Sequence, residues 1–122
     1  MTKRILVVED QEDNRRILRD LLTSADYEMT EAENGEEALA SVVELRPDLI
    51  LMDIQLPIMD GYEATRRIKA DPSLKDIPII VVTSYALSGD ETKARDAGCD
   101  AYVTKPYSPR QLLAKIREFL PQ

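Results

Sequence analysis

Histidine is absent from this chain of 122 residues, and cysteine occurs only once, at Cys99. A single cysteine cannot form an internal disulfide bond, which agrees with a reducing compartment. Its neighbours Gly98 and Asp100 supply no cation that would activate a thiol, so we expect Cys99 to be a small packing residue. Without histidine, and with its one cysteine remote, a metal site in this chain would use oxygen ligands.

Runs of lysine or arginine and long apolar segments are also missing. The chain has 23 acidic and 16 basic residues and a net charge of -7, so on average it would repel a nucleic-acid backbone. Only four apolar residues follow Lys3 and Arg4, which is too few for the core of a signal peptide, and no apolar stretch approaches a membrane span. We therefore expect no direct nucleic-acid binding, no membrane insertion and a cytoplasmic location.

The composition is that of one folded domain. Hydrophobic residues make up 43% of the chain and charged residues 32%, which favours a folded and very soluble protein over a disordered one. No internal repeat, low-complexity tract or linker interrupts residues 1–122. We expect a single domain over this whole range, with no attached second domain.

Apolar periodicity alternates along the chain between two kinds of segment. Apolar residues recur at the i, i+3, i+4 spacing of a helix at Ile17, Leu18, Leu21 and Leu22, at Ala38, Leu39, Val42 and Val43, and at Leu112, Leu113, Ile116, Phe119 and Leu120. Short β-rich runs lie at residues 5–8, 27–32, 49–52, 79–83 and 101–104. The regular alternation predicts an α/β fold.

The predicted sheet is parallel. The first, third and fourth runs are apolar at both alternating positions, which is typical of strands whose two faces are covered. The second run contains Glu28, Thr30 and Glu31, so we expect it at an edge. With right-handed crossovers, these features favour a doubly wound sheet of five strands in the order 2-1-3-4-5, with helices on both faces.

One predicted helix differs from the others. Between Gly89 and Gly98 only Ala94 and Ala97 offer apolar contacts, whereas other helices bring several large side chains each. Because burial of a large aliphatic side chain contributes about 1.5 to 3 kcal/mol, this helix is anchored more weakly. We expect it to be the part of the domain that moves.

Polar residues close the predicted strands, and in a parallel sheet all of these strand ends lie on one edge. They are Glu9 and Asp10 after the first strand, Asp53 after the third, Thr83 and Ser84 at the end of the fourth, and Lys105 and Pro106 after the fifth. Because the strand order reverses between the first and third strands, their acids flank the crevice where doubly wound proteins bind ligands.

An acidic crevice of this kind predicts a bound cation. Three carboxylates without a counter-charge would raise one another's pKa, and oxygen ligands favour a hard ion, with Mg²⁺ the best fit and Mn²⁺ or Ca²⁺ as alternatives. Taken singly, each acid is also an ordinary helix N-cap, Thr83 a strand residue and Lys105 a solvated surface residue. The convergence of all of them on one edge favours the ligand site.

Four motifs occur in order: VVED at 7–10, LILMDIQLPIMDG at 49–61, VVTSYA at 81–86 and YVTKP at 102–106. Through them the chain resembles, over essentially its whole length, the response-regulator receiver domains, the CheY-like family of two-component signalling. The MDIQLP wording is most similar to the single-domain DivK-type cell-cycle regulators. The resemblance implies the flavodoxin-like (βα)5 fold.

The resemblance also implies a chemistry. Asp53 would be the phosphoacceptor that attacks a phosphohistidine of a partner protein. Mg²⁺, or Mn²⁺ in its place, would be held directly or through water by Glu9, Asp10, Asp53 and the backbone carbonyl of Gln55.

Further residues are assigned by the resemblance. Thr83 and Lys105 would contact the phosphoryl oxygens, and Thr83 would act with Tyr102 as a conformational switch, although Tyr102 also reads as a half-buried strand residue. The peptide bond between Lys105 and Pro106 would be cis. Ser84 replaces the alanine usual in the family, and its hydroxyl could compete for the phosphate. Gln55 stands at a position that, in the family, is associated with the rate of dephosphorylation.

Because the chain has no histidine, its donor would be a sensor histidine kinase or a histidine phosphotransfer protein. Its output would be borne by another protein, docked on the face of the fourth helix, fifth strand and fifth helix. The resemblance thus implies a stand-alone response regulator, a phosphoacceptor protein rather than an enzyme beyond self-phosphorylation from small donors and self-dephosphorylation.

Three other functions are alternatives for a chain with this pattern. A phosphatase of the haloacid dehalogenase type would need a second acid two residues after Asp53, where the chain has Gln55. A flavodoxin-like FMN carrier would need a hydroxyl-rich phosphate loop in place of the acidic segment 9–14. A pseudo-receiver that only binds partners would keep the fold and lack the phosphoryl chemistry.

Overall fold

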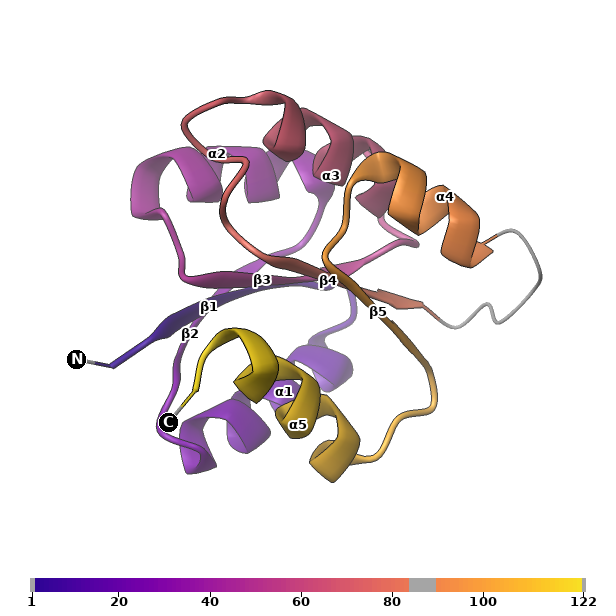
Figure 1. Cartoon of the computed structure of the whole chain (residues 1–122). Helices are drawn as coiled ribbons and strands as arrows, with labels where there is room; N and C mark the ends of the chain where they lie inside the picture. Colours follow the sequence, from indigo (N-terminus) through magenta and orange to yellow (C-terminus); the bar gives the residue numbers. More distant parts are fainter. Residues whose placement is uncertain (1, 84–89, 122) are drawn as a thin grey trace.

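Figure 1 shows the computed structural model of the chain, in which residues 2–83 and 90–121 are described. Strands and helices alternate in the order β1 (Arg4–Val8), α1 (Glu12–Ser24), β2 (Glu28–Ala32), α2 (Gly35–Leu45), β3 (Leu49–Asp53), α3 (Gly61–Ala70), β4 (Ile79–Thr83), α4 (Asp90–Ala97), β5 (Ala101–Thr104) and α5 (Pro109–Phe119). The strands form one parallel sheet in the order β2-β1-β3-β4-β5, which confirms the predicted fold and strand order.

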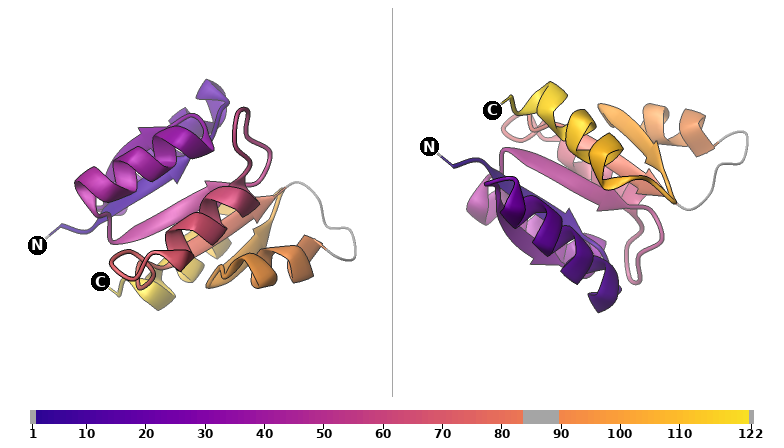
Figure 2. Two further views of the ribbon diagram at one scale, coloured as in Figure 1. Left: turned by 90° about the horizontal axis from the view of Figure 1, so that it is seen from above. Right: turned by 90° about the horizontal axis from the view of Figure 1, so that it is seen from below.

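Helices cover both faces of this sheet, with α2, α3 and α4 on one face and α1 and α5 on the other (Figures 1 and 2). Alternate residues of each inner strand feed the two cores: Leu6 and Val8 face the first helix layer, whereas Ile5 and Val7 face the second. Every residue of β3 and β4 is buried, while β2 keeps two exposed positions. The predictions of two covered faces and of an edge strand are therefore confirmed.

The buried stripes of the helices are narrower than the sequence predicts. On α1 the buried residues are Arg15, Leu18 and Leu22, whereas Ile17 is 60% exposed. On α2, Val43 is also 60% exposed. The assignment of Ile17 and Val43 to the buried stripes is wrong, because each is rotated by about 100° from its buried neighbour and a helix in an outer layer buries a single narrow stripe.

Helix α4 is short, and among its described side chains, at residues 92–97, the buried ones are Ala94 and Ala97. The apolar contacts predicted for this helix are confirmed, and its movement stays a prediction. Gly89 and Ser84 lie outside the described residues. Cys99, just after α4, is half-buried against the core, and burial raises the pKa of its thiol, as expected for a packing residue.

Both chain ends lie at the edge of the sheet where β1 begins, opposite the carboxyl ends of the inner strands (Figures 1 and 2). Within residues 2–83 and 90–121, no helix has the length and apolar character needed to cross a membrane.

Candidate functional site

Two neighbouring strands bring distant acids together at the carboxyl edge of the sheet. Val8 pairs with Met52, so the residues that follow them, Glu9 and Asp53, lie side by side. One carboxylate oxygen from each of Glu9, Asp10 and Asp53 lies within 4.8 Å of the others. Glu9 is 3% and Asp53 is 8% exposed, so this is a largely buried acidic cluster rather than a solvated surface group.

The cluster opens into a cavity of about 430 Å³. Its lining combines predicted site residues with two polar residues that the sequence did not single out: Glu9, Asp10, Asp53, Gln55 and Lys105, together with Gln11 and Asn14. The polar side chains that line it offer carboxylates, amides and an ammonium. The predicted convergence of the acids and Lys105 on one crevice is therefore confirmed as geometry.

Lys105 supplies a counter-charge within the acidic cluster. Its Nζ lies 3.2 Å from Glu9 Oε1 and 3.0 Å from Asp53 Oδ2, and its side chain is only 24% exposed. The alternative reading of Lys105 as a solvated surface residue is wrong. Its main chain is held as well, since Lys105 N donates to Thr83 O over 2.7 Å, and the Lys105–Pro106 bond is cis, as the resemblance implied.

Proton affinities in the cluster reflect burial and neighbouring charge. Burial raises the pKa of the Asp10 carboxyl, and a hydrogen bond with Glu9 and the charge of Glu9 raise it further. Burial alone would lower the pKa of Lys105, but the hydrogen bond and charge of Asp53, with those of Glu9, outweigh it and raise that pKa. One ammonium therefore balances only part of the negative charge of three acids.

Local hydrogen bonds orient the carboxylates of Glu9 and Asp53. Glu9 accepts from Gln11 N over 3.1 Å and from Asn14 Nδ2 over 3.3 Å. Asp53 Oδ1 accepts from Gln55 N over 3.1 Å. The helices begin elsewhere, since the N-cap of α1 is Gln11 and that of α3 is Asp60. The alternative that these acids are simple helix caps is wrong.

The loop after β3 packs closely on the main chain of Asp53. Gly61 N donates to Ile54 O over 3.0 Å, which folds residues 54–60 back onto the strand end. A Cβ atom at Gly61 would lie 2.1 Å from Asp53 O, so only glycine allows this approach. The backbone that carries Asp53 is thereby clamped between β4 and α3.

Thr83 and Tyr102 occupy the strands next to this crevice. Thr83 is the fully buried last residue of β4, one position beyond Val82, which pairs with Asp53. Tyr102 pairs with Val81, two residues before Thr83, so both side chains belong to the face covered by α3 and α4. Tyr102 lines a separate cavity of about 270 Å³ between α4, β5 and α5.

Residues 5–117 match the family model of the response regulator receiver domain. The chain belongs to this family. This receiver domain is 46% identical, over 98% of both chains, to the polar-differentiation response regulator DivK of Brucella anthropi. It is a component of two-component signalling, of the DivK-like kind.

Two similar receiver structures contain a bound metal ion. The receiver domain of the sensor histidine kinase PA1611 from Pseudomonas aeruginosa PAO1, with magnesium coordinated in the active-site cleft, is 35% identical, with a TM-score of 0.92 and full coverage of both chains. The Mn²⁺-bound form of the response regulator Rcp1 is 30% identical, with a TM-score of 0.82, and the match covers 95% of this chain and 90% of that one. The all-oxygen donor set of Glu9, Asp10 and Asp53, of which Glu9 and Asp53 are buried, fits such an ion.

Arg15, which contacts the main chain of Glu9, is a further residue that the sequence pattern did not point to. Arg15 is 8% exposed and its Nη1 donates to the backbone carbonyl of Glu9 over 2.8 Å. A signal was present, because Arg15 precedes Leu18 by three residues and Leu22 by seven and so shares their buried face. It was hidden within the charged segment 12–16, where every neighbour suggests a solvated surface.

Proposed function

We propose that this receiver domain accepts a phosphoryl group on Asp53 from a phosphohistidine of a partner protein, in a magnesium-dependent reaction. The observation that supports this proposal is the cluster of three carboxylates within 4.8 Å, two of them buried, with Lys105 placed 3.0 Å from Asp53. In the transfer, a carboxylate oxygen of Asp53 attacks phosphorus and the P–N bond of the donor breaks. The donor imidazole keeps the electron pair of that bond, and Asp53 becomes an acyl phosphate.

The acids and the amine have separate roles in this proposal. Glu9, Asp10 and Asp53, with the backbone carbonyl of Gln55, would hold Mg²⁺, and Mn²⁺ could replace it. The bound ion would neutralise charge on the transferring group and align it. Lys105 would turn from Asp53 to the phosphoryl oxygens without a large movement, and the hydroxyl of Thr83 would donate to the same group.

We propose that the phosphoryl group then works as a switch. It adds about 1.5 to 2 negative charges and three acceptor oxygens beside the end of β4. Thr83 would move toward those oxygens and Tyr102 would fill the space behind it, because both lie on the face covered by α3 and α4. The weakly anchored α4 would shift with them and change the surface formed by α4, β5 and α5, where a target protein would dock.

The donor in this scheme is a sensor histidine kinase or a histidine phosphotransfer protein. Since the DivK relative matches over 98% of its own length, we propose that the receiver itself carries the signal to its target as a stand-alone regulator. Its catalysis would be limited to self-phosphorylation from small donors and self-dephosphorylation. The cytoplasmic location stays a prediction from the sequence.

The experiment that tests the acceptor function is the stoichiometry of phosphate uptake with and without Mg²⁺. With acetyl phosphate or a phosphohistidine donor and Mg²⁺, the protein should gain one phosphoryl group that is both acid-labile and base-labile. With excess EDTA, uptake should fall to background, because the charge on the transferring oxygens is then unbalanced. Absence of uptake under both conditions, from either donor, would favour the pseudo-receiver.

Lys105→Ala is expected to separate ion binding from signalling. Removing an ammonium 3.0 Å from Asp53 should leave Mg²⁺ binding intact or tighten it, because a competing cation is lost. The variant should nevertheless lose the amide chemical-shift changes that phosphorylation produces in β4 and β5. Calorimetry and NMR measure the two properties, and Lys75→Ala, on the exposed α3–β4 segment, is the control. A full phosphorylation response in Lys105→Ala would contradict the assigned role.

A further inference from the structure

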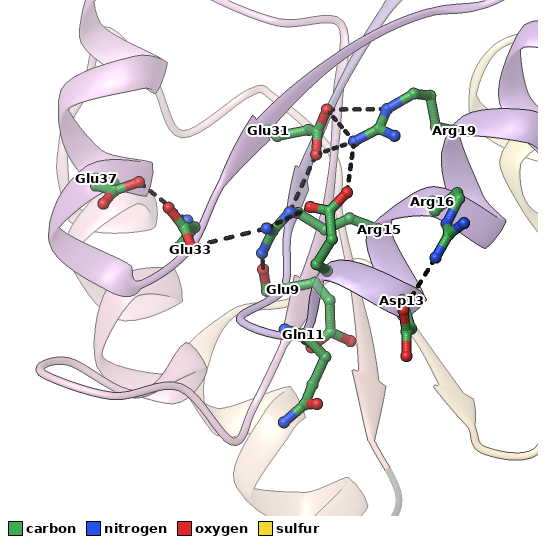
Figure 3. A network of polar contacts seen from close by, with 10 residues as sticks. Glu9, Gln11, Asp13, Arg15, Arg16, Arg19, Glu31, Glu33 and Glu37 are labelled. Carbon is green, nitrogen blue, oxygen red and sulfur yellow. Dashed lines mark hydrogen bonds and ion pairs between the residues drawn. The ribbon is translucent and has the colours of Figure 1, made fainter.

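Figure 3 shows Arg15 at the centre of a polar network that reaches Glu9, one of the three acids of the crevice. Its side chain is 10% exposed, although it comes from the first turn of a surface helix. Nη2 lies 2.6 Å from Glu12 and 3.7 Å from Glu33, and Nε lies 3.1 Å from Glu31. One guanidinium thus joins α1, the end of β2 and the β2–α2 connection.

The fourth contact of Arg15 leads to the crevice. Nη1 donates to the backbone carbonyl of Glu9 over 2.8 Å, while the backbone N–H of Glu9 donates to Ala32 O over 3.0 Å. The main chain of Glu9 is therefore held on both sides, by Arg15 and by β2. Because its backbone is fixed, the Glu9 side chain is held in the direction of Asp53 and Lys105. The backbone of the following residue, Asp10, is positioned by the same contacts, so its side chain is also placed at the crevice.

The charge of Arg15 is compensated away from the crevice. Glu12, Glu31 and Glu33 surround the guanidinium, and Arg19 shares two of them, at 2.7 Å from Glu31 and 3.7 Å from Glu12. The planar fork of arginine satisfies the glutamates and the Glu9 carbonyl at the same time, which the single nitrogen of lysine cannot do. The arrangement suits a geometric role better than an electrostatic one.

We propose that Arg15 is a positioning residue for the metal site, holding the Glu9 carbonyl so that Glu9 and Asp10 are preorganised for a divalent cation. This inference rests on the proposed function, because it requires that the crevice binds Mg²⁺. Partners that orient the ligands of a metal site typically change metal affinity by 10- to 100-fold when removed. Arg15 acts one step further back, through the main chain, so we expect an effect of about tenfold.

The direction in which Mg²⁺ affinity changes on mutation of Arg15 distinguishes a positioning role from a purely electrostatic one. Arg15→Met removes a positive charge close to the proposed metal site, so on electrostatics alone the variant should bind Mg²⁺ more tightly. Positioning predicts the opposite, a dissociation constant for Mg²⁺ that rises about tenfold. Arg15→Lys, which keeps the charge but loses the fork, should show an intermediate rise.

Two matched controls remove an arginine from the same helix without touching Glu9. Arg16 pairs with the exposed Asp13, and Arg19 pairs with the same Glu31 and Glu12 that contact Arg15. Arg16→Met and Arg19→Met should bind Mg²⁺ within twofold of the parent protein, even where Arg19→Met lowers the melting temperature. Calorimetric titration with MgCl₂ alone gives the dissociation constants, and thermal unfolding is recorded on the same samples.

Phosphorylation kinetics add a second readout. With acetyl phosphate, Arg15→Met should need about tenfold more Mg²⁺ for half-maximal rate, while the rate at saturating Mg²⁺ approaches that of the parent. Unchanged Mg²⁺ affinity in Arg15→Met, or an equal loss in Arg19→Met, would overturn the positioning role. If Arg15→Met does not fold, Arg15→Lys decides in the same way. If the parent protein itself fails to bind Mg²⁺, the proposed function fails instead.

Discussion

Asp53→Asn is expected to take up no phosphate from acetyl phosphate or from a phosphohistidine donor. The amide has the shape of the carboxylate but no anionic oxygen to attack phosphorus, so the acyl phosphate cannot form. The fold should survive, because the side chain keeps its volume at the end of β3 and an amide oxygen can still accept from Gln55 N. Intact-protein mass spectrometry should show an increase of about 80 Da, one phosphoryl group, in the parent protein only.

The matched control is Asp13→Asn. Asp13 lies in the first turn of α1, four residues after Glu9. Its side chain is 86% exposed and forms an ion pair with Arg16. Like Asp53→Asn, the Asp13→Asn substitution removes one carboxylate, so the two variants have the same net charge. The control should be labelled to the parental stoichiometry. Equal labelling of Asp53→Asn would place the acceptor elsewhere and refute the assignment.

Most of the fold could be predicted because burial on both faces leaves a strong pattern in the sequence. Before their last residues, β3 and β4 carry apolar side chains on both faces, which is typical of a parallel sheet between two helix layers. The exact ends of the strands were harder to predict. The structure extends β3 by one residue to include Asp53, because Asp53 still pairs with Val82 on β4. That pairing depends on a neighbour 29 residues away and leaves no local signal.

The acidic cluster could also be predicted, since strand order alone brings Glu9, Asp10 and Asp53 to one edge. The exact position of the Lys105 amine could not be predicted, because a long flexible side chain can reach several partners from the same backbone. In the structure it takes the place of a counter-ion between Glu9 and Asp53. The exposure of Ile17 could not be predicted either, because Ile17 and the adjacent Leu18 are both apolar and only one of them fits the narrow buried stripe of α1.

Gly61→Ala is expected to destabilise the domain by about 3 kcal/mol, at the upper end of the range for overpacked sites. The new Cβ would lie 2.1 Å from Asp53 O and 2.9 Å from both Asp53 C and Ile54 Cα. All three are backbone atoms of the segment that carries the acceptor, so no side-chain rotation can relieve the clash. Urea unfolding measures the loss, and the phosphorylation rate of the folded fraction should fall too, because relief of the clash must displace Asp53.

Gly98→Ala is the matched control for this prediction. Gly98 has φ of +100°, and a Cβ atom there would lie 3.1 and 3.2 Å from side-chain atoms of Lys69 rather than from backbone. Alanine there should cost about 1 kcal/mol through its backbone conformation, and it should leave the phosphorylation rate of the folded protein unchanged, since no atom of the crevice is displaced. If Gly61→Ala were as stable and as reactive as the Gly98→Ala control, the close packing of the β3–α3 loop on Asp53 would not be what holds the acceptor in place.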